Sequence, residues 1–284
     1  MTTLNNFTHI DGDAFESLAD FSFGDPYSVN YKPLQISSEL KNIAEKKKNI
    51  ILFVDTQRLL PLIELITPFE CEIAIIAHNS DHTINHNFSD IIPKNIKIWC
   101  QNYNNIETDR LYSLPIGMER VRWFPELDKR TVLDYYREKN RAGKTEPISI
   151  YFNCNCKTNP IREQMLHFLS NFKNYPCIIK TIGNGSSFEE YLKDIIEVTH
   201  VLSPPGNGID CHRTWETLYL NRIPILIRSH FVQNIYHDLP AIIIDKFDDL
   251  NYINNDNIID KHYNFEKLNF EYWKNKILNS HYER

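Results

Sequence analysis

A cationic and an acidic side chain lie three residues apart behind a glycine turn. Residues 203–216 read Ser-Pro-Pro-Gly-Asn-Gly-Ile-Asp-Cys-His-Arg-Thr-Trp-Glu, which puts Arg213 and Glu216 in a predicted helix. Side chains at this spacing lie on the same side of a helix. An arginine can hold a diphosphate through two parallel hydrogen bonds, and a carboxylate can accept from the two adjacent hydroxyls of a ribose. The pair therefore predicts a binding site for a nucleotide sugar.

The turn before this helix has the composition of an anion site. An apolar run at 198–202 predicts a buried strand, and Gly206 and Gly208 follow it where the helix is to begin. Free backbone N–H groups and the helix dipole attract phosphate at such a junction. Glycine also serves simple turns, so the glycines alone are weak evidence. Three more residues of this loop and helix start are candidate donor contacts, with helix capping and surface exposure as the alternatives: Asn207, Asp210 and His212.

A second polar loop is expected at the same edge of the predicted sheet. It follows the strand predicted at 148–152 and reads Asn-Cys-Asn-Cys-Lys-Thr-Asn over 153–159. Open α/β sheets bind ligands at the carboxyl ends of their strands. An ordinary polar loop is the alternative interpretation. The further candidate donor contacts are Asn153, Lys157, Thr158, Arg162 and, just past another predicted strand, Arg228.

The residues that follow Glu216 carry a resemblance to a known family. The pattern P-x-G-x-x-x-x-x-x-R-x-x-E, which begins at Pro204, is followed by Ile-Pro-Ile at 223–225. It resembles the donor-site segment of exostosin-like glycosyltransferases, the family 47-like group. Segments 77–81 and 114–117 also fit that group, whereas the first 45 residues have no similarity to it. The resemblance implies two Rossmann-like domains facing a cleft, the GT-B arrangement, and transfer of a hexosyl or pentosyl group to a glycan hydroxyl.

The same resemblance implies inversion at the anomeric carbon, which requires a base for the acceptor hydroxyl. Asp81 is the first candidate and His78 the second, because both follow the strand predicted at 72–77. Asp81 also suits a turn cap, which is the alternative role. Glu119 is a third candidate, and Asp25 in the N-terminal loop stays open as a fourth.

Neither a metal ion nor a cofactor is expected, and the donor serves as a co-substrate. Asp11 and Asp13 form a D-x-D, the metal-binding pattern of another glycosyltransferase fold, but no strand precedes them. No cluster of histidine, cysteine and acidic residues has metal-ligand spacing. Positive groups at the diphosphate can stabilise the leaving group instead.

Composition excludes several classes of protein. The 284 residues carry a formal net charge of −6, which argues against a nucleic-acid partner. Six cysteines in a chain of this length do not form a small disulfide scaffold. No signal peptide is recognisable, and no apolar stretch reaches the about 18 residues that a transmembrane helix needs. We therefore expect a cytoplasmic protein that can also act at a membrane surface, on lipid-linked or protein-linked glycans.

Apolar runs separated by helical or loop segments predict parallel βαβ units and an α/β fold. The expected strands are 50–54, 72–77, 96–99, 111–116, 148–152, 177–181, 198–202, 223–227 and 241–245. Two helix starts are well marked. Asn159 is a predicted N-cap with Pro160 in the first helical position, and Ser187 with Glu190 can form a capping box.

A polar segment that ends at Pro147 marks the predicted domain boundary. We expect an acceptor-side domain at 1–145 and a nucleotide-sugar-binding domain at 146–262. The resemblance adds that a C-terminal helix within 263–284 returns to the first domain. The first 30 residues have no clear periodicity and are left unassigned.

Two other functions remain open. A nucleotide-sugar-modifying Rossmann enzyme would need a glycine fingerprint after the strand at 50–54, where the sequence reads Asp-Thr-Gln-Arg. A non-catalytic carbohydrate- or nucleotide-binding protein could keep the same fold, because function depends on the site. Slow hydrolysis of a donor without acceptor would separate an enzyme from a binding protein.

Overall fold

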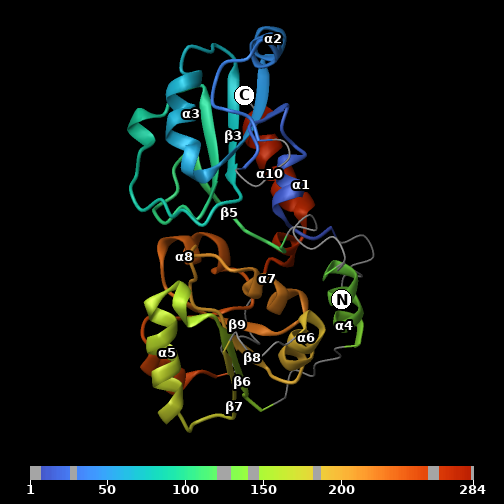
Figure 1. The fold of residues 1–284 in the computed structure, drawn as a ribbon, viewed down its shortest axis with the longest axis vertical. Coiled ribbons are helices and arrows are strands. Elements are labelled where there is room, and N and C mark those ends of the chain that lie inside the picture. The colour runs from blue at the N-terminus through green and yellow to red at the C-terminus, as the bar shows by residue number, and fades with distance from the viewer. Residues whose placement is uncertain are drawn as a thin grey trace. The chain divides into compact units, whose positions relative to one another are not determined.

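The computed structural model describes residues 8–25, 31–119, 129–139, 147–181, 187–254 and 262–282. The chain divides into two compact units: unit 1 is Met1–Ile116 with Asn269–Arg284, and unit 2 is Gly117–Leu268. Each unit is built on one parallel five-stranded sheet (Figure 1), so the fold is α/β. The division after Ile116 comes earlier than the boundary expected after residue 145, and the polar segment that suggested that boundary falls partly outside the described residues.

The strands of unit 1 lie side by side in the order in which they occur in the chain, β1-β2-β3-β4-β5. Their apolar side chains are almost all buried, as expected for a sheet covered on both faces. The strands are β1 (Phe21–Ser22), β2 (Asn49–Asp55), β3 (Glu72–His78), β4 (Ile96–Gln101) and β5 (Leu111–Leu114). All four strands predicted for this half of the chain are present, and β1 is an additional one.

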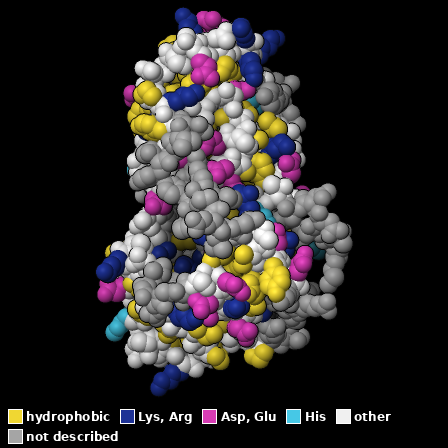
Figure 2. Space-filling model, turned by 45° about the vertical axis from the view of Figure 1, so that its right-hand side comes forward, with side chains coloured by type: hydrophobic (Ala, Val, Ile, Leu, Met, Phe, Trp, Pro, Cys, Tyr) yellow, Lys and Arg dark blue, Asp and Glu magenta, His cyan; other side chains and the backbone are white. Residues whose placement is uncertain are grey.

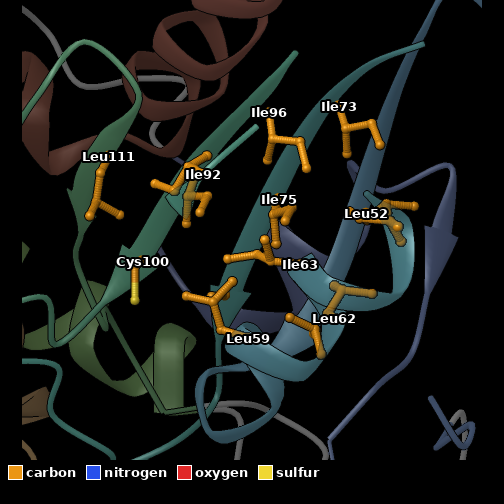
Figure 3. Packing of buried hydrophobic residues seen from close by; sticks show 14 of the residues in the cluster. Leu52, Leu59, Leu62, Ile63, Ile73, Ile75, Ile92, Ile96, Cys100 and Leu111 are labelled. Carbon is orange, nitrogen blue, oxygen red and sulfur yellow. The ribbon is translucent and has the colours of Figure 1, made fainter. Parts of the chain in front are cut away.

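One face of this sheet packs on α2 (Ser38–Lys46) and α3 (Leu59–Ile66). Figure 3 shows Leu59, Leu62 and Ile63 of α3 pointing toward the side chains of the strands. The core forms because the apolar residues of α3 recur at helical spacing, so that one stripe meets the sheet.

The opposite face is covered by a short helix near the start of the chain and by the last described helix (Figure 1). Both α1 (Gly12–Glu16) and α10 (Phe270–Tyr282) contact β3, and the rings of Phe15 and Phe270 lie 5.4 Å apart. The C-terminal helix therefore returns to the first unit, as predicted. Asp11 is the N-cap of α1, with its carboxylate accepting from the Ala14 N–H at 2.7 Å, so this acid of the D-x-D has a structural role.

The sheet of unit 2 has a different order, β10-β9-β8-β6-β7. Its first strand, β6, pairs with β7 on one side and with β8 on the other, so the winding direction reverses between β6 and β8. The strands are β6 (Ile150–Cys154), β7 (Cys177–Thr181), β8 (His200–Leu202), β9 (Ile223–Ile227) and β10 (Ile242–Ile244). The helices are α4 (Lys129–Lys139), α5 (Pro160–Asn171), α6 (Phe188–Ile196), α7 (His212–Tyr219) and α8 (His230–Tyr236).

The helix starts predicted for unit 2 are confirmed. Asn159 caps α5 by accepting from the Ile161 N–H, and Pro160 is its first residue. Ser187 and Glu190 form the capping box of α6. The described part of the unit also contains three short 3-10 helices, η4 (Cys156–Thr158), η5 (Phe247–Tyr252) and η6 (Phe265–Leu268). Among the described residues, no helix is both long and apolar enough to cross a bilayer.

Candidate functional site

The reversal between β6 and β8 places the predicted donor residues at one edge of unit 2. Loops leave β6 and β8 in opposite directions, and open α/β sheets bind ligands at the carboxyl ends of strands where this happens. Asn153 and Cys154 end β6, and the glycine turn after β8 leads into α7 with Arg213 and Glu216. The fold therefore brings the two predicted loops to a single edge.

Arg213 has donor groups for which the described residues offer no oxygen acceptor. Its Nη1 lies 3.4 Å from the Cys154 sulfur, and its Nε is buried without a hydrogen-bond partner in the described part of the chain. Burial alone would lower the pKa of the guanidinium, but neighbouring groups, foremost Cys154 and Tyr191, raise it above its usual value. A permanent cation with unused N–H groups is suited to binding an anion.

Glu216 is buried and held in place by a tyrosine. Its Oε2 accepts from the hydroxyl of Tyr191 at 2.7 Å, and its side chain has no other hydrogen bond among the described residues. Burial, and then the nearby Glu216, raise the pKa of Tyr191 well above its usual value. The tyrosine hydroxyl therefore stays protonated and donates, which orients the carboxylate and leaves Oε1 as an acceptor for a ligand.

A second hydrogen-bonded chain fixes Asn153 at the end of β6. The Asn153 amide donates to the Tyr151 hydroxyl at 2.8 Å, and that hydroxyl donates to Asp194 at 3.0 Å. Lys180 in turn forms an ion pair with Asp194. These bonds fix the position of the Asn153 side chain at the end of β6.

Arg162 has a structural task in this site. Its five N–H donors have five acceptors, namely the carbonyl oxygens of Asn155, Pro204 and Pro205, the hydroxyl of Thr158 and the sulfur of Cys211. The guanidinium stabilises the turn after β8 through these hydrogen bonds. It would have to break some of them to contact a phosphate.

Gly206 is the residue that allows this close approach of Arg162. A Cβ atom at Gly206 would lie 2.7 Å from Arg162 Nη2. The Asn159 side chain also donates to the Gly206 carbonyl oxygen at 2.9 Å. The Gly206 N–H donates to the carbonyl oxygen of Gly208. The absence of a side chain at Gly206 thus makes room for an arginine of the same unit.

Asp210 and His212 are both engaged within unit 2. Asp210 accepts from the Cys211 N–H and from the side chains of Trp215 and Tyr236, which ties the turn to α7 and α8. The N-cap of α7 is Cys211, so Asp210 precedes the position expected for it. The Nδ1 of His212 lies 2.8 Å from the Gly117 carbonyl oxygen, a geometry that requires Nδ1 to carry a proton.

The remaining candidate donor contacts are hydrogen-bonded close by in sequence, ion-paired or exposed. Thr158 donates to the Asn155 carbonyl oxygen, while Lys157 and Asn207 are exposed. Arg228 directly follows β9 and forms an exposed ion pair with Asp245, which directly follows β10.

The predicted bases have distinct surroundings. Both ring nitrogens of His78 face oxygen acceptors, namely the Pro115 carbonyl at 2.9 Å and Asn79 Oδ1 at 2.8 Å. The orientation of the Asn79 amide is set by its donation to the buried Asp25. His78 therefore has no nitrogen lone pair directed at a substrate in this arrangement.

The two acidic candidates lie in different units. Glu119 lies in unit 2 and is ion-paired with Lys129. Asp81 is exposed in the loop after β3.

Sequence reasoning missed the residues that support Arg213 and Glu216. Tyr191 occupies a helix position at which an aromatic side chain suits simple packing, and Tyr151 lies inside a buried strand. Only their proximity in space indicates a polar role.

Figure 2 shows acidic and basic side chains interspersed over the described part of one face, without a broad basic patch. No family model matches this chain, and no curated protein matches it significantly. The fold and the residues of the site are therefore the basis for a functional assignment.

Proposed function

We propose that this protein is an exostosin-like glycosyltransferase that binds a nucleotide-sugar donor at the β6–β8 reversal of unit 2. It transfers the sugar to a hydroxyl of a glycan acceptor, with inversion and without a metal ion. The proposal includes a cytoplasmic setting, which is supported by the six cysteines, all described and all unpaired.

One observation carries the proposal, namely that Arg213 and Glu216 both have hydrogen-bonding groups without a described oxygen or nitrogen partner. The cation has N–H groups without oxygen acceptors, and the carboxylate has one oxygen held by Tyr191 and one without a described partner. A nucleoside diphosphate offers the matching groups, because its phosphates accept from the guanidinium and its ribose hydroxyls donate to the carboxylate.

In the proposed reaction the acceptor hydroxyl attacks the anomeric carbon while the bond from that carbon to the diphosphate oxygen breaks. The nucleoside diphosphate leaves with the electron pair, and Arg213 stabilises the charge that develops on it. The hydroxyl proton passes to a base. We propose that Asp81, which is exposed in the loop after β3, is this base.

The test is the melting temperature of the full chain with UDP, GDP, ADP and their sugar conjugates. A ligand that binds only the folded state raises this temperature. We expect one nucleoside diphosphate to do so, and Glu216→Ala to weaken its binding by about 10- to 150-fold, the equivalent of losing a charged hydrogen bond. Glu197→Ala, at an exposed position just after α6, is the matched control. The absence of a shift with every nucleotide would contradict the proposal.

A non-catalytic nucleotide- or carbohydrate-binding protein of the same fold is the second candidate. It is favoured by the engagement of the candidate bases His78 and Glu119 with other residues of the chain. Release of nucleoside diphosphate from a bound donor, with or without acceptor, supports the enzyme. Tight binding with no release over hours supports the binding protein.

A further inference from the structure

A pocket of about 570 Å³ lies along the C-terminal half of α5, against η5. The N-terminus of α5 is tied to the turn after β8 through Asn159 and Gly206, whereas the pocket begins at Gln164 and extends past the helix end to Asn174. Because α5 has 12 residues and a helix rises about 1.5 Å per residue, the pocket is distinct from the Arg213 site. Its volume is within the range of ligand sites, roughly 300–1,000 Å³.

Three half-buried phenylalanine rings form its apolar surface. Phe168 has its ring centroid 5.8 Å from that of Phe172 and 5.8 Å from that of Phe247. The three side chains also pack on the core of unit 2, so the position of the rings is fixed. Aromatic faces carry negative charge and attract the positively polarised C–H groups of a ligand. A pyranose ring presents such C–H groups on its flat faces.

The polar lining consists mainly of primary amides. They are supplied by Gln164 and Asn171 of α5, by Asn174 after it, and by Asn251 of η5. The last two are joined by a hydrogen bond of 2.8 Å, which fixes that side of the pocket. An amide has both a donor and an acceptor at neighbouring atoms, which matches a pair of adjacent hydroxyl groups.

The charge of the lining indicates a neutral ligand. No carboxylate is among the described lining residues, and among them only His167 and Lys173 have a basic side chain. These residues include neither an arginine nor the N-terminus of an α-helix to bind a phosphate, in contrast to the Arg213 site.

We propose that this pocket is a second glycan site, which binds a neutral oligosaccharide with its sugar faces on the phenylalanine rings and its hydroxyls on the amides. The site goes beyond the proposed function and does not depend on it, since the pocket shares no residue with the Arg213 site. It would hold a chain of sugars on residues other than those proposed to bind the donor.

The test is saturation-transfer NMR and calorimetry on the full chain with maltotriose, cellotriose and N-acetylated chitotriose. We expect at least one trisaccharide to bind saturably, with transfer from aromatic protons to the ring protons of the sugar. Gln164→Ala and Asn171→Ala each remove one amide from exposed positions on α5 and should weaken binding by about 2- to 10-fold, the loss expected for one neutral hydrogen bond. Glu163→Ala, on the same helix but outside the lining, should leave it unchanged.

Three results would overturn the proposal. They are the absence of binding by all three trisaccharides, binding that is unaffected by both amide variants, and binding of AMP with the same dependence on those amides, which would make this a nucleotide pocket. Glu216→Ala separates the two proposals, because it should weaken nucleoside diphosphate and leave trisaccharide affinity unchanged.

Discussion

The two units are built from the same parts and differ in the order of their strands. Unit 1 runs β1-β2-β3-β4-β5 without a reversal, and unit 2 runs β10-β9-β8-β6-β7 with one. In a sheet wound in one direction, right-handed connections stay on one face and neighbouring loops do not diverge. In unit 2 the loops after β6 and β8 diverge, which leaves space for a ligand between them.

The carboxyl edge of unit 1 is accordingly occupied by its own side chains. Asp55 at the end of β2 is ion-paired with Arg58, and Asn79 after β3 bonds to both Asp25 and Gln101. The Arg58 guanidinium also donates to backbone carbonyl oxygens of the segments after β1. This polar network engages the side chains directly at the ends of β2 and β3 with one another.

The difference between the units is clear from the hydrogen-bond acceptors of one arginine in each. Arg58 in unit 1 has a carboxylate and backbone oxygens for its donors, whereas Arg213 in unit 2 has a thiol and a buried Nε without a partner. The same side chain is therefore structural in one unit and a candidate ligand group in the other. Burial and residue type do not separate these two roles, but the inventory of acceptors does.

The largest expected effect is on stability and belongs to unit 1. Arg58→Met should lower the free energy of unfolding by about 3–5 kcal/mol, because it leaves the buried Asp55 carboxylate without its cation. Urea denaturation followed by circular dichroism measures this change. Nucleoside diphosphate affinity, measured on the folded fraction, should stay the same.

A matched control for that change is Lys41→Met. Lys41 pairs with Glu45 on the surface of α2, with both side chains about two-thirds exposed at 66% and 65%. An exposed pair of this kind contributes about 0.3–0.5 kcal/mol. If Arg58→Met cost no more than this control, or if it weakened nucleotide binding, the structural role given to Arg58 would be wrong.

The next effect is a loss of stability in acid, which the units should share. Burial, and then Arg222, lower the pKa of His200 in unit 2 to about 4, and burial, and then Lys97, do the same to His281 in unit 1. Above pH 6.5 such a histidine is neutral in both the folded and the unfolded chain. Between pH 6.5 and 4 only the unfolded chain gains the proton, so acidification favours unfolding, and below pH 4 no further loss follows.

The His200 contribution is about 3 kcal/mol over that interval, from a shift of roughly 2.5 pKa units. His200→Leu should therefore flatten the dependence of unfolding free energy on pH between 6.5 and 4, as measured by urea titrations at a series of pH values. An unchanged slope in this variant would mean that His200 is protonated in the folded protein.

Much of the fold could be predicted from sequence because its signals are local. Each predicted strand is an apolar run of four to six residues, and the caps at Asn159 and Ser187 are set by side chains next to the helix starts they serve. The order of the strands could not be predicted in this way. The apolar pattern does not indicate that β8 lies beside β6 and not beside β7, and this placement creates the site.

The site was predictable only where a residue's role follows from its neighbours in sequence. Arg213 and Glu216 are linked by helical spacing, and the sequence could pair them. Arg162 was expected to contact a ligand, but its five bonds go to a turn more than 40 residues away and to its own helix start. A count of donors and acceptors requires the coordinates of both partners.

The binding site itself gives the third prediction, which tests the two arginines directly. Arg213→Met should weaken nucleoside diphosphate binding by about 10- to 150-fold, the range for hydrogen bonds to a charged group, with a small change in stability. Calorimetric titration of the ligand found in the melting-temperature panel measures this loss. Equal affinity in wild type and Arg213→Met would remove the distinction between Arg213 and Arg58.

The smallest effect concerns the tyrosine that orients Glu216. Tyr191→Phe removes one hydroxyl and leaves the ring, so the packing of α6 is kept while the carboxylate loses its donor. Nucleoside diphosphate affinity should fall by about 2- to 10-fold, as for one hydrogen bond. The matched control in unit 1 is Tyr103→Phe, whose hydroxyl donates to the Ile106 carbonyl oxygen at 3.0 Å and which should leave affinity unchanged. If both variants lowered affinity alike, the effect would be one of general stability, and the claim that the reversal in unit 2 creates a preorganised site would fail.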